Sequence, residues 1–439
     1  MARIVDLIEK KRDGGTHSRD ELEAIVGGYV RNEVPDYQIA AWLMAVCWRG
    51  MTPDEVATLT QVMAASGEQL DLSPIGKPVA DKHSTGGVGD KTSLVVMPLV
   101  AACGVPVGKM SGRGLGFTGG TIDKLESFPG IRLDLDAATF VRQLGEIGIV
   151  ITGQSADLAP ADGKLYALRD VTGTVPNLPL IASSIMSKKL AAGADVIVLD
   201  VKTGSGAFVR ERGSAVELAK AMIGIGSAAG RRMAAVVSDM SQPLGRAIGN
   251  ALEVAEALDT LENHGPPDFT SFAVELATLI VELATSSQMG GLAVEQALRS
   301  GAAREQLRRM IEGQGGDTRA FDDRSLLPQA TLHRPVLAES DGYISQLDAL
   351  TVAGASIVLG AGRERKGDPI DLAVGVRLEA KIGDRVGRGQ PIAVLFANDE
   401  LRLPEAERVL RGGIQLSTVP VAPPAIILER LGASAASPG

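Results

Sequence analysis

A glycine-rich stretch, DKHSTGGVGD at residues 81–90, carries the densest set of groups that could bind an anion. Glycines let the backbone approach a ligand closely and expose several N–H groups. A helix predicted to begin near Lys91 would add unsatisfied amides and the positive end of its dipole. The stretch does not match GxxxxGK[ST], so it is not a Walker loop. We expect its phosphate-binding side chains to be those of Lys82, Ser84 and Ser93.

A second glycine-rich loop, KMSGRG at residues 109–114, repeats this arrangement between a predicted strand and a predicted helix. If the two strands are parallel, both loops lie at the carboxyl edge of one sheet, where open α/β sheets bind ligands. Asp123 and Glu126 open the following helix, where carboxylates either satisfy backbone amides or take part in catalysis. We expect four further phosphate-binding residues here: Lys109, Met110, Ser111 and Thr121.

The stretch KMSGRGLGFTGGTIDKLE, residues 109–126, resembles the signature of the thymidine and pyrimidine-nucleoside phosphorylase family. DKHSTGGVGD, LYALRDVTGTV and IASSIMSKKLAAGAD are similar to other parts of that family, and the similarity covers nearly the full chain. One departure is Phe117, where family members usually carry His. The resemblance implies phosphorolysis of uridine, thymidine and deoxyuridine by inorganic phosphate. VPVGKMSGRG favours this broad range over the alternative, strict use of thymidine.

The resemblance also implies a pyrimidine site on two predicted helices. Tyr166 and Arg169 lie on one helix face, and Ser184 and Lys188 lie on one face of the next helix. The charged groups would contact the O4 and O2 edges of the ring, and the Ser hydroxyl would contact N3. The base-binding residues implied by the resemblance are Leu115, Tyr166, Arg169, Ile181, Ser184 and Lys188.

The implied reaction is a single displacement with inversion. Phosphate attacks C1′ while the bond to N1 breaks, and the products are a free base and an α-configured sugar 1-phosphate. His83, in the first loop, would contact phosphate and donate a proton to the departing base. Arg169 and Lys188 would stabilise the negative charge on that base, which completes the expected catalytic set. Phosphate and base residues lie in different predicted domains, so catalysis should require domain closure.

No cofactor is expected, and inorganic phosphate serves as co-substrate. The resemblance implies a potassium site in the pyrimidine-nucleoside branch of the family. In this chain it maps to Gly89, Lys91, Leu244, Ala247 and Glu256. Because Lys91 carries its own ammonium group, which could replace the ion, we expect a weak or absent potassium dependence.

Three sequence patterns predict the domains that must position these residues. Residues 1–66 and 160–192 show helical periodicity, which predicts a small discontinuous all-helical domain. Residues 79–155 and 194–330 alternate apolar strands with helices, which predicts a larger α/β domain with a mostly parallel sheet. Residues 336–430 predict a C-terminal β-rich domain, and residues 431–439 predict a disordered tail.

The composition limits the possible partners. The net charge of −9 and an aromatic content of 3% argue against nucleic acid and anionic membranes. The longest apolar run, residues 94–107, is too short to span a bilayer, so we expect a cytoplasmic protein. The family resemblance implies a homodimer through the N-terminal helices. His17, His264 and His333 show no metal-binding spacing and are expected at the surface.

Two other functions match parts of the chain. An enzyme related to anthranilate phosphoribosyltransferase would share the helical and α/β plan. It would need acidic ligands for a magnesium-bound pyrophosphate, and KMSGR and SSIMSKK match it poorly. GDRVGRGQPIAVL resembles the hairpin of biotinyl and lipoyl carriers, but the following turn, FANDELRLP, contains no lysine to modify.

Overall fold

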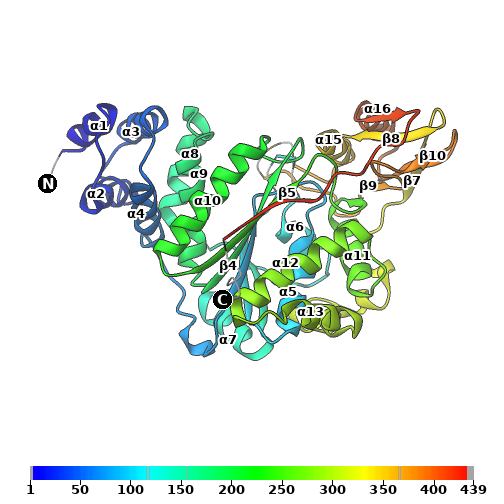
Figure 1. Cartoon of the computed structure of the whole chain (residues 1–439), viewed down its shortest axis with the longest axis horizontal. Coiled ribbons are helices and arrows are strands. Elements are labelled where there is room, and N and C mark those ends of the chain that lie inside the picture. The colour runs from blue at the N-terminus through cyan, green and yellow to red at the C-terminus, as the bar shows by residue number, and fades with distance from the viewer. Residues whose placement is uncertain are drawn as a thin grey trace, which may run out of the picture.

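The computed structural model describes residues 3–114, 116–117, 119–155, 157–363, 365 and 367–432. Its parts follow one another along the long axis of the molecule (Figure 1). The N-terminal helices lie at one end, the main sheet lies in the middle, and the C-terminal strands with α15 and α16 lie at the other end. The fold class predicted from the sequence is confirmed: a helical domain, a larger α/β domain and a C-terminal strand-rich domain.

The helical domain is assembled from two separate stretches of chain. Side chains from the first stretch, such as Leu22, Ile25 and Trp42, share one core with Leu165 and Leu180 from the second. Ser18 and Thr52 each cap a helix through the backbone N–H three residues later, as the sequence SRDEL predicts for the first of them. The helices are α1 (Ile4–Arg12), α2 (Arg19–Val30), α3 (Asp36–Arg49), α4 (Pro53–Ala64), α8 (Pro160–Thr172) and α9 (Leu178–Ala191).

The main sheet has the strand order β13-β5-β4-β1-β2-β3. Five of its strands are parallel: β1 (Ala80–Ser84), β2 (Val107–Ser111), β3 (Ile149–Gly153), β4 (Val196–Thr203) and β5 (Arg232–Asp239). Their apolar runs are buried on both faces, as expected for parallel strands covered by helices. The covering helices are α5 (Thr92–Ala102), α6 (Thr121–Leu125), α7 (Ala137–Ile147), α10 (Arg212–Ala228), α11 (Asn250–Leu261), α12 (Pro267–Thr285), α13 (Gly290–Arg299) and α14 (Ala302–Gly313).

The C-terminal domain shares a continuous hydrophobic core with the α/β domain. Strand β6 (Ala247–Ile248) leaves the α/β domain and pairs with β9 (Gly375–Leu378) in a sheet of order β6-β9-β11-β7. A second sheet has the order β10-β8-β12. The remaining elements are β7 (Leu332–Leu337), β8 (Gly342–Leu347), α15 (Ala349–Leu359), β10 (Arg385–Val386), β11 (Pro391–Ala397), α16 (Leu403–Gly412) and β12 (Ile414–Ser417). Short 3₁₀ helices occur at Ser73–Ile75, Thr318–Phe321, Arg324–Leu326 and Glu400–Arg402.

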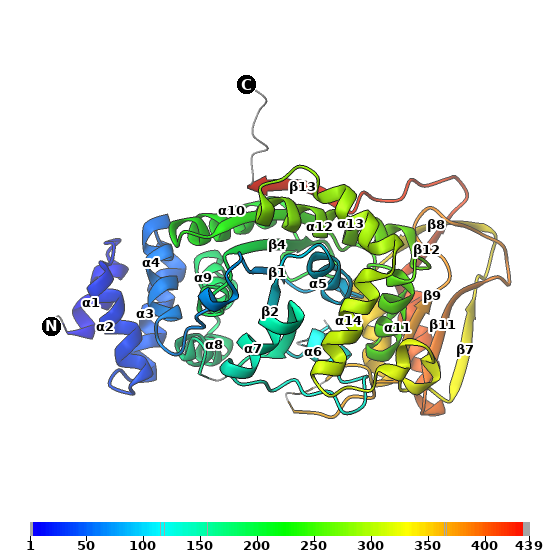
Figure 2. The same cartoon turned by 90° about the horizontal axis from the view of Figure 1, so that it is seen from below.

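The structure corrects two expectations from the sequence. The chain returns to the main sheet, where β13 (Ile427–Gly432) pairs antiparallel with β5, so residues 427–432 do not belong to the C-terminal domain or to a tail (Figure 2). Residues 433–439 of the expected tail lie outside the described residues. His17 is buried and accepts a hydrogen bond from Trp42 Nε1 at 3.2 Å, whereas His264 and His333 are exposed. Within the described part of the chain, every helix is too short or too polar to span a membrane.

Candidate active site

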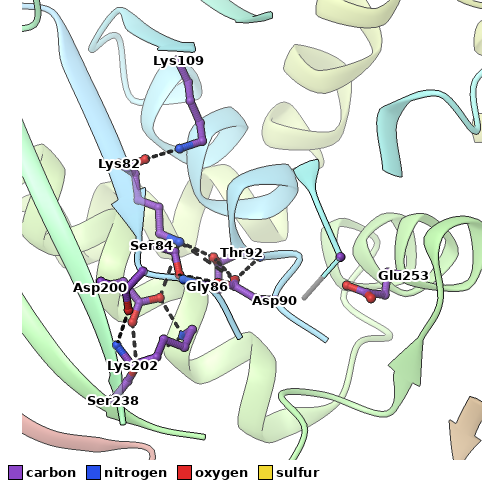
Figure 3. Close-up of polar contacts among 12 residues, drawn as sticks. Lys82, Ser84, Gly86, Asp90, Thr92, Lys109, Asp200, Lys202, Ser238 and Glu253 are labelled. Atoms are coloured by element: carbon purple, nitrogen blue, oxygen red, sulfur yellow. Dashed lines mark hydrogen bonds and ion pairs between the residues drawn. The ribbon is translucent and has the colours of Figure 1, made fainter. Parts of the chain in front are cut away.

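Lys82 is fully buried in β1, and its ammonium group lies beside two carboxylates (Figure 3). Its Nζ donates to Thr92 Oγ1 and lies 3.5 Å from Asp200 Oδ2 and 4.0 Å from Asp90 Oδ1. Asp200 comes from β4, which runs parallel to β1 with Ser84 opposite Asp200. The register of these two strands therefore places a carboxylate behind the expected phosphate-binding lysine.

Asp200 also holds a second buried lysine. Lys202 Nζ lies 2.7 Å from Asp200 Oδ2, and Ser238 Oγ donates to Asp200 Oδ1 at 2.6 Å. A buried carboxylate needs such partners, because losing them would leave an uncompensated charge. No motif in the sequence pointed to Asp200, Lys202 or Ser238 as part of the site. The signal that could have revealed the first two was a pair of charged residues inside the otherwise apolar strand VIVLDVKT.

The loop after β1 folds around Asp90, which was also not among the residues expected in the site. Ser84 Oγ donates to Asp90 Oδ2, and the backbone N–H of Gly86 donates to Ser84 Oγ at 3.2 Å. Burial alone would raise the pKa of Asp90, but Lys82 and Lys202 hold it well below its usual range. An ionised carboxylate therefore organises the first glycine-rich loop from inside.

Lys109 joins the second strand to the first, since its Nζ donates to the backbone oxygen of Lys82 at 2.6 Å. Burial and the nearby Lys189 lower the pKa of Lys109 to about 7. Burial also holds the pKa of His83 well below its usual range, and four ammonium groups lower it further: those of Lys189, Lys109, Lys82 and Lys188. The Nε2 atom of His83 is buried without a hydrogen-bond partner in the described structure. An anion would be stabilised in these surroundings.

The other expected phosphate residues lie at the ends of neighbouring elements. Ser93 is buried in the first turn of α5, Ser111 ends β2, and Thr121 begins α6. Met110 contributes its backbone oxygen, which accepts from Lys189 Nζ at 3.4 Å. We call the following set the phosphate wall: Lys82, His83, Ser84, Ser93, Lys109, Met110, Ser111 and Thr121.

Arg169 and Lys188 lie on α8 and α9, where their donors are directed at neighbouring groups of the helical domain. Arg169 donates to the backbone oxygens of Thr174, Leu180 and Val175 at 3.3, 3.1 and 2.8 Å, and its burial lowers its pKa. Lys188 Nζ pairs with Asp162 and donates to the backbone oxygen of Ser184 at 2.7 Å.

Other expected base-binding residues lie on the same two helices. Tyr166 and Ile181 are half-buried, and Ser184 is buried. We call the following set the base wall: Tyr166, Arg169, Ile181, Ser184 and Lys188. Leu115 lies outside the described residues.

The five residues of the implied potassium site come together around the ammonium group of Lys91. Its Nζ donates to the backbone oxygens of Leu244 and Ala247 at 3.1 and 3.0 Å and lies 2.5 Å from Glu256 Oε1. Gly89 has φ of 69°, and a Cβ there would lie 2.6 Å from the backbone oxygen of Leu244, so only glycine suits this approach. The ammonium group uses the oxygens that a potassium ion would need, so the residues present do not fit a bound ion.

Phe117, the departure from the family pattern, is half-buried in the loop before α6. Its ring packs against Phe208, with the centroids 5.1 Å apart. Phe208 lies between β4 and α10 and is itself exposed. The pair therefore adds an apolar contact between the second glycine-rich loop and the segment that follows β4.

Comparison with family models divides the chain into three matched regions. Residues 5–67 match the helical bundle domain of a glycosyl transferase family, and residues 76–304 match the a/b domain of that family. Residues 343–417 match the pyrimidine nucleoside phosphorylase C-terminal domain. The hairpin that resembles biotinyl and lipoyl carriers lies within this last region.

Two similar proteins carry the name pyrimidine-nucleoside phosphorylase. The one from Geobacillus stearothermophilus is 50% identical over 432 residues, which cover 98% of this chain and 100% of the relative. The one from Staphylococcus aureus (strain USA300) is 52% identical over 400 residues, which cover 90% of this chain and 92% of the relative.

Among solved structures, the anthranilate phosphoribosyltransferase of Thermus thermophilus has a similar fold. The TM-score is 0.57 at 20% sequence identity, and the match covers 70% of this chain and 99% of the other. At 20% identity this similarity supports a shared fold only. The two relatives that are 50% and 52% identical show the family. The chain belongs to the pyrimidine-nucleoside phosphorylase family of glycosyl transferases.

Proposed function

We propose that this protein cleaves pyrimidine nucleosides with inorganic phosphate, giving the free base and an α-D-ribose or deoxyribose 1-phosphate. The observation that carries the proposal is that α9, which bears Ser184 and Lys188 of the base wall, is bonded to the strands of the phosphate wall. The adjacent Lys189 lies 2.7 Å from Asp81 of β1 and donates to the backbone oxygen of Met110 in β2 at 3.4 Å. We infer that the two walls face one site, and the names of the half-identical relatives agree with this reading.

The proposed mechanism follows from where charge would develop. Dianionic phosphate attacks C1′ in a single displacement with inversion, while negative charge grows on the departing pyrimidine. Arg169 and Lys188 stabilise that charge. His83 is neutral in the free protein, since its pKa is low. Bound phosphate adds negative charge beside the imidazole and raises its pKa, which lets His83 deliver a proton to the base.

Domain closure is part of this proposal. Arg169 and Lys188 belong to helices that share the core of the helical domain, whereas Lys82 and Lys109 belong to the main sheet. Lys188 is paired with Asp162 within the helical domain. A nucleoside between the walls offers polar edges to both, so its binding favours approach of the two domains.

Lys91 takes the place of a bound cation in the proposed enzyme, which therefore needs no potassium. The fixed ammonium group supplies one positive charge to the same two backbone oxygens and one carboxylate. It thereby ties the start of α5, next to the first loop, to β6 and α11.

We also infer that the protein forms a homodimer through its helical domain. Tyr37 and Trp48 on α3 are 74% and 82% exposed, and Val171 near the end of α8 is 78% exposed. Large exposed apolar side chains on the helical domain favour this domain as the interface. A cytoplasmic location stays a prediction from the composition.

The proposed function is tested by mixing the protein with uridine or thymidine and following release of free base. We expect release with added phosphate and none without it. Failure to release any pyrimidine at high enzyme concentration would overturn the proposal. A kcat/KM for thymidine far above that for uridine would instead restrict it to strict use of thymidine.

A further inference from the structure

The C-terminal domain reaches the second glycine-rich loop through Arg363. The Nη1 of Arg363 donates to Asp123 Oδ2 at 3.0 Å, and the Nη2 donates to Oδ1 at 2.8 Å. Arg363 lies shortly after α15, whereas Asp123 lies in α6, directly after the loop. A two-pronged pair of this kind fixes the orientation of the carboxylate as well as its charge.

The carboxylate of Asp123 in turn binds the second glycine-rich loop through the backbone of that loop. Its Oδ2 accepts from the N–H of Gly114 at 2.6 Å, and its Oδ1 accepts from Arg113 Nη1 at 3.1 Å. The side chain of Asp123 is only 2% exposed. Burial alone would raise its pKa, but Arg363 and the N–H of Gly114 hold the pKa below its usual range. Arg363 therefore helps to keep this buried carboxylate ionised and able to hold the loop.

The loop held by Asp123 joins two residues of the phosphate wall, Ser111 and Thr121. It closes back on itself, since a Cβ on Gly120 would lie 2.2 Å from the backbone nitrogen of Gly114. A shift of Asp123 would move the start of α6 and, through Gly114, the end of β2. Both changes would reach groups that we assign to phosphate. Of the expected base contacts only Leu115 adjoins Gly114 in sequence, whereas the base wall lies on α8 and α9.

Arg363 is itself attached to the α/β domain. Asn250, the first residue of α11, donates from Nδ2 to the backbone oxygen of Ala361 at 3.0 Å. The backbone N–H of Asp371 donates to the backbone oxygen of Gly360 at 2.9 Å on the other side. The segment before Arg363 is thus anchored in both domains, which gives its guanidinium group a defined position.

We propose that Arg363 is a positioning residue for phosphate binding, through which the C-terminal domain sets the geometry of the second loop. The inference rests on the proposed function only for the identity of the ligand, inorganic phosphate. It gives the C-terminal domain a role in the site although none of its residues belongs to either wall.

The test compares Arg363→Ala, Arg363→Lys and wild-type protein in two measurements. Titration calorimetry with inorganic phosphate gives the dissociation constant, and steady-state assays give separate KM values for phosphate and uridine. For Arg363→Ala we expect both phosphate constants to rise by about tenfold, and the KM for uridine to change by less than about twofold. The phosphate constants of Arg363→Lys should lie between those of wild type and Arg363→Ala, since a lysine keeps the charge but loses the two-pronged contact. Added methylguanidinium should restore part of the phosphate affinity of Arg363→Ala.

The matched control is Arg377→Ala, which removes an arginine of the same domain that pairs with Glu379 at 2.8 Å and is 52% exposed. It should leave all three constants unchanged. Phosphate constants within about twofold of wild type in both Arg363 variants would overturn the inference. Equal losses for phosphate and uridine that follow the melting temperature would overturn it too.

Two further outcomes separate this inference from the proposed function. If Arg363→Ala does not fold, Arg363→Lys and Asp123→Asn give the same comparison. If wild-type protein binds phosphate but releases no base, the proposed function fails, and the calorimetric comparison still decides the role of Arg363. If wild-type protein binds no phosphate, the inference is overturned.

Discussion

The cationic groups of the phosphate wall and of the base wall have different kinds of neighbour. Lys82 and Lys109 lie within the main sheet, where their partners are a carboxylate of the next strand, the hydroxyl of Thr92 and a backbone oxygen. Lys188 is 25% exposed and pairs with Asp162 of the adjacent helix. The cations of the phosphate wall are therefore held by partners that the sheet fixes, whereas Lys188 is held by a partner on a neighbouring helix.

This difference follows from the elements that carry the two walls. Parallel strands in register bring side chains of distant segments to fixed positions, and the core around them resists rearrangement. The base wall lies on α8 and α9, where the partners of Arg169 and Lys188 come from the same helices and the segment between them. The inner part of α9 also packs against the main sheet and α10, so closure would have to move the outer helices relative to this shared core.

The largest effect should come from Lys188→Ala, which removes the charge that we assign to the departing base. We expect kcat to fall by about a thousandfold, while the dissociation constant for phosphate stays within about twofold. Steady-state kinetics and phosphate titration check the two parts. Lys220→Ala, an exposed lysine of α10, is the control and should leave both unchanged. A collapse of phosphate affinity would show that the walls are not separate.

Lys82→Met should affect the phosphate wall. We expect phosphate affinity to fall by about a hundredfold, because a charge-assisted contact is removed and Asp200 loses one of its two ammonium neighbours. The free energy of unfolding should decrease by about 3 kcal/mol, since a buried charge is left less compensated. Phosphate titration and urea unfolding measure these changes. Unaltered phosphate affinity in a folded variant would remove Lys82 from the site.

Lys91→Ser tests whether an internal ammonium group supports the phosphate wall. In wild-type protein, replacing potassium by tetramethylammonium at equal ionic strength should change kcat/KM by less than about twofold. The variant leaves the backbone oxygens of Leu244 and Ala247 and the carboxylate of Glu256 without their ammonium partner. Potassium should bind these oxygens and raise kcat/KM of the variant by about tenfold. Wild-type activity that disappears without potassium and returns with it would contradict the assignment.

The smallest effect concerns pH. Lys109 has its pKa lowered to about 7, so it is charged below about pH 7 and loses its charge as the pH rises. Phosphate binding favours the charged form, and we expect its affinity to weaken by several-fold between about pH 7 and pH 8.5 from this group. Lys109→Arg keeps its charge throughout and should flatten the profile. Calorimetry across this range, with thermal unfolding as a check on folding, distinguishes the two profiles.

Much of the fold and of the phosphate site could be predicted from local sequence. Alternating apolar strands and helices indicate a parallel sheet, and glycine-rich loops after two strands indicate an anion site at its carboxyl edge. The position of β13 could not be read in this way, because an edge strand is chosen by pairing with β5 and not by its own periodicity. His17 was expected at the surface for a similar reason, since its partner Trp42 lies on α3, away from the connection between α1 and α2 that carries His17.

The sequence by itself determined the two glycine-rich loops, the residue types on them and the family to which the chain belongs. Only the tertiary structure decided which charges meet. Asp200 is more than a hundred residues from Lys82, and it reaches Lys82 because β4 pairs in register with β1. Arg363 reaches Asp123 because a separate domain is attached to α11. Buried charges need partners, and in a folded chain those partners are set by strand pairing and domain packing, which no local pattern encodes.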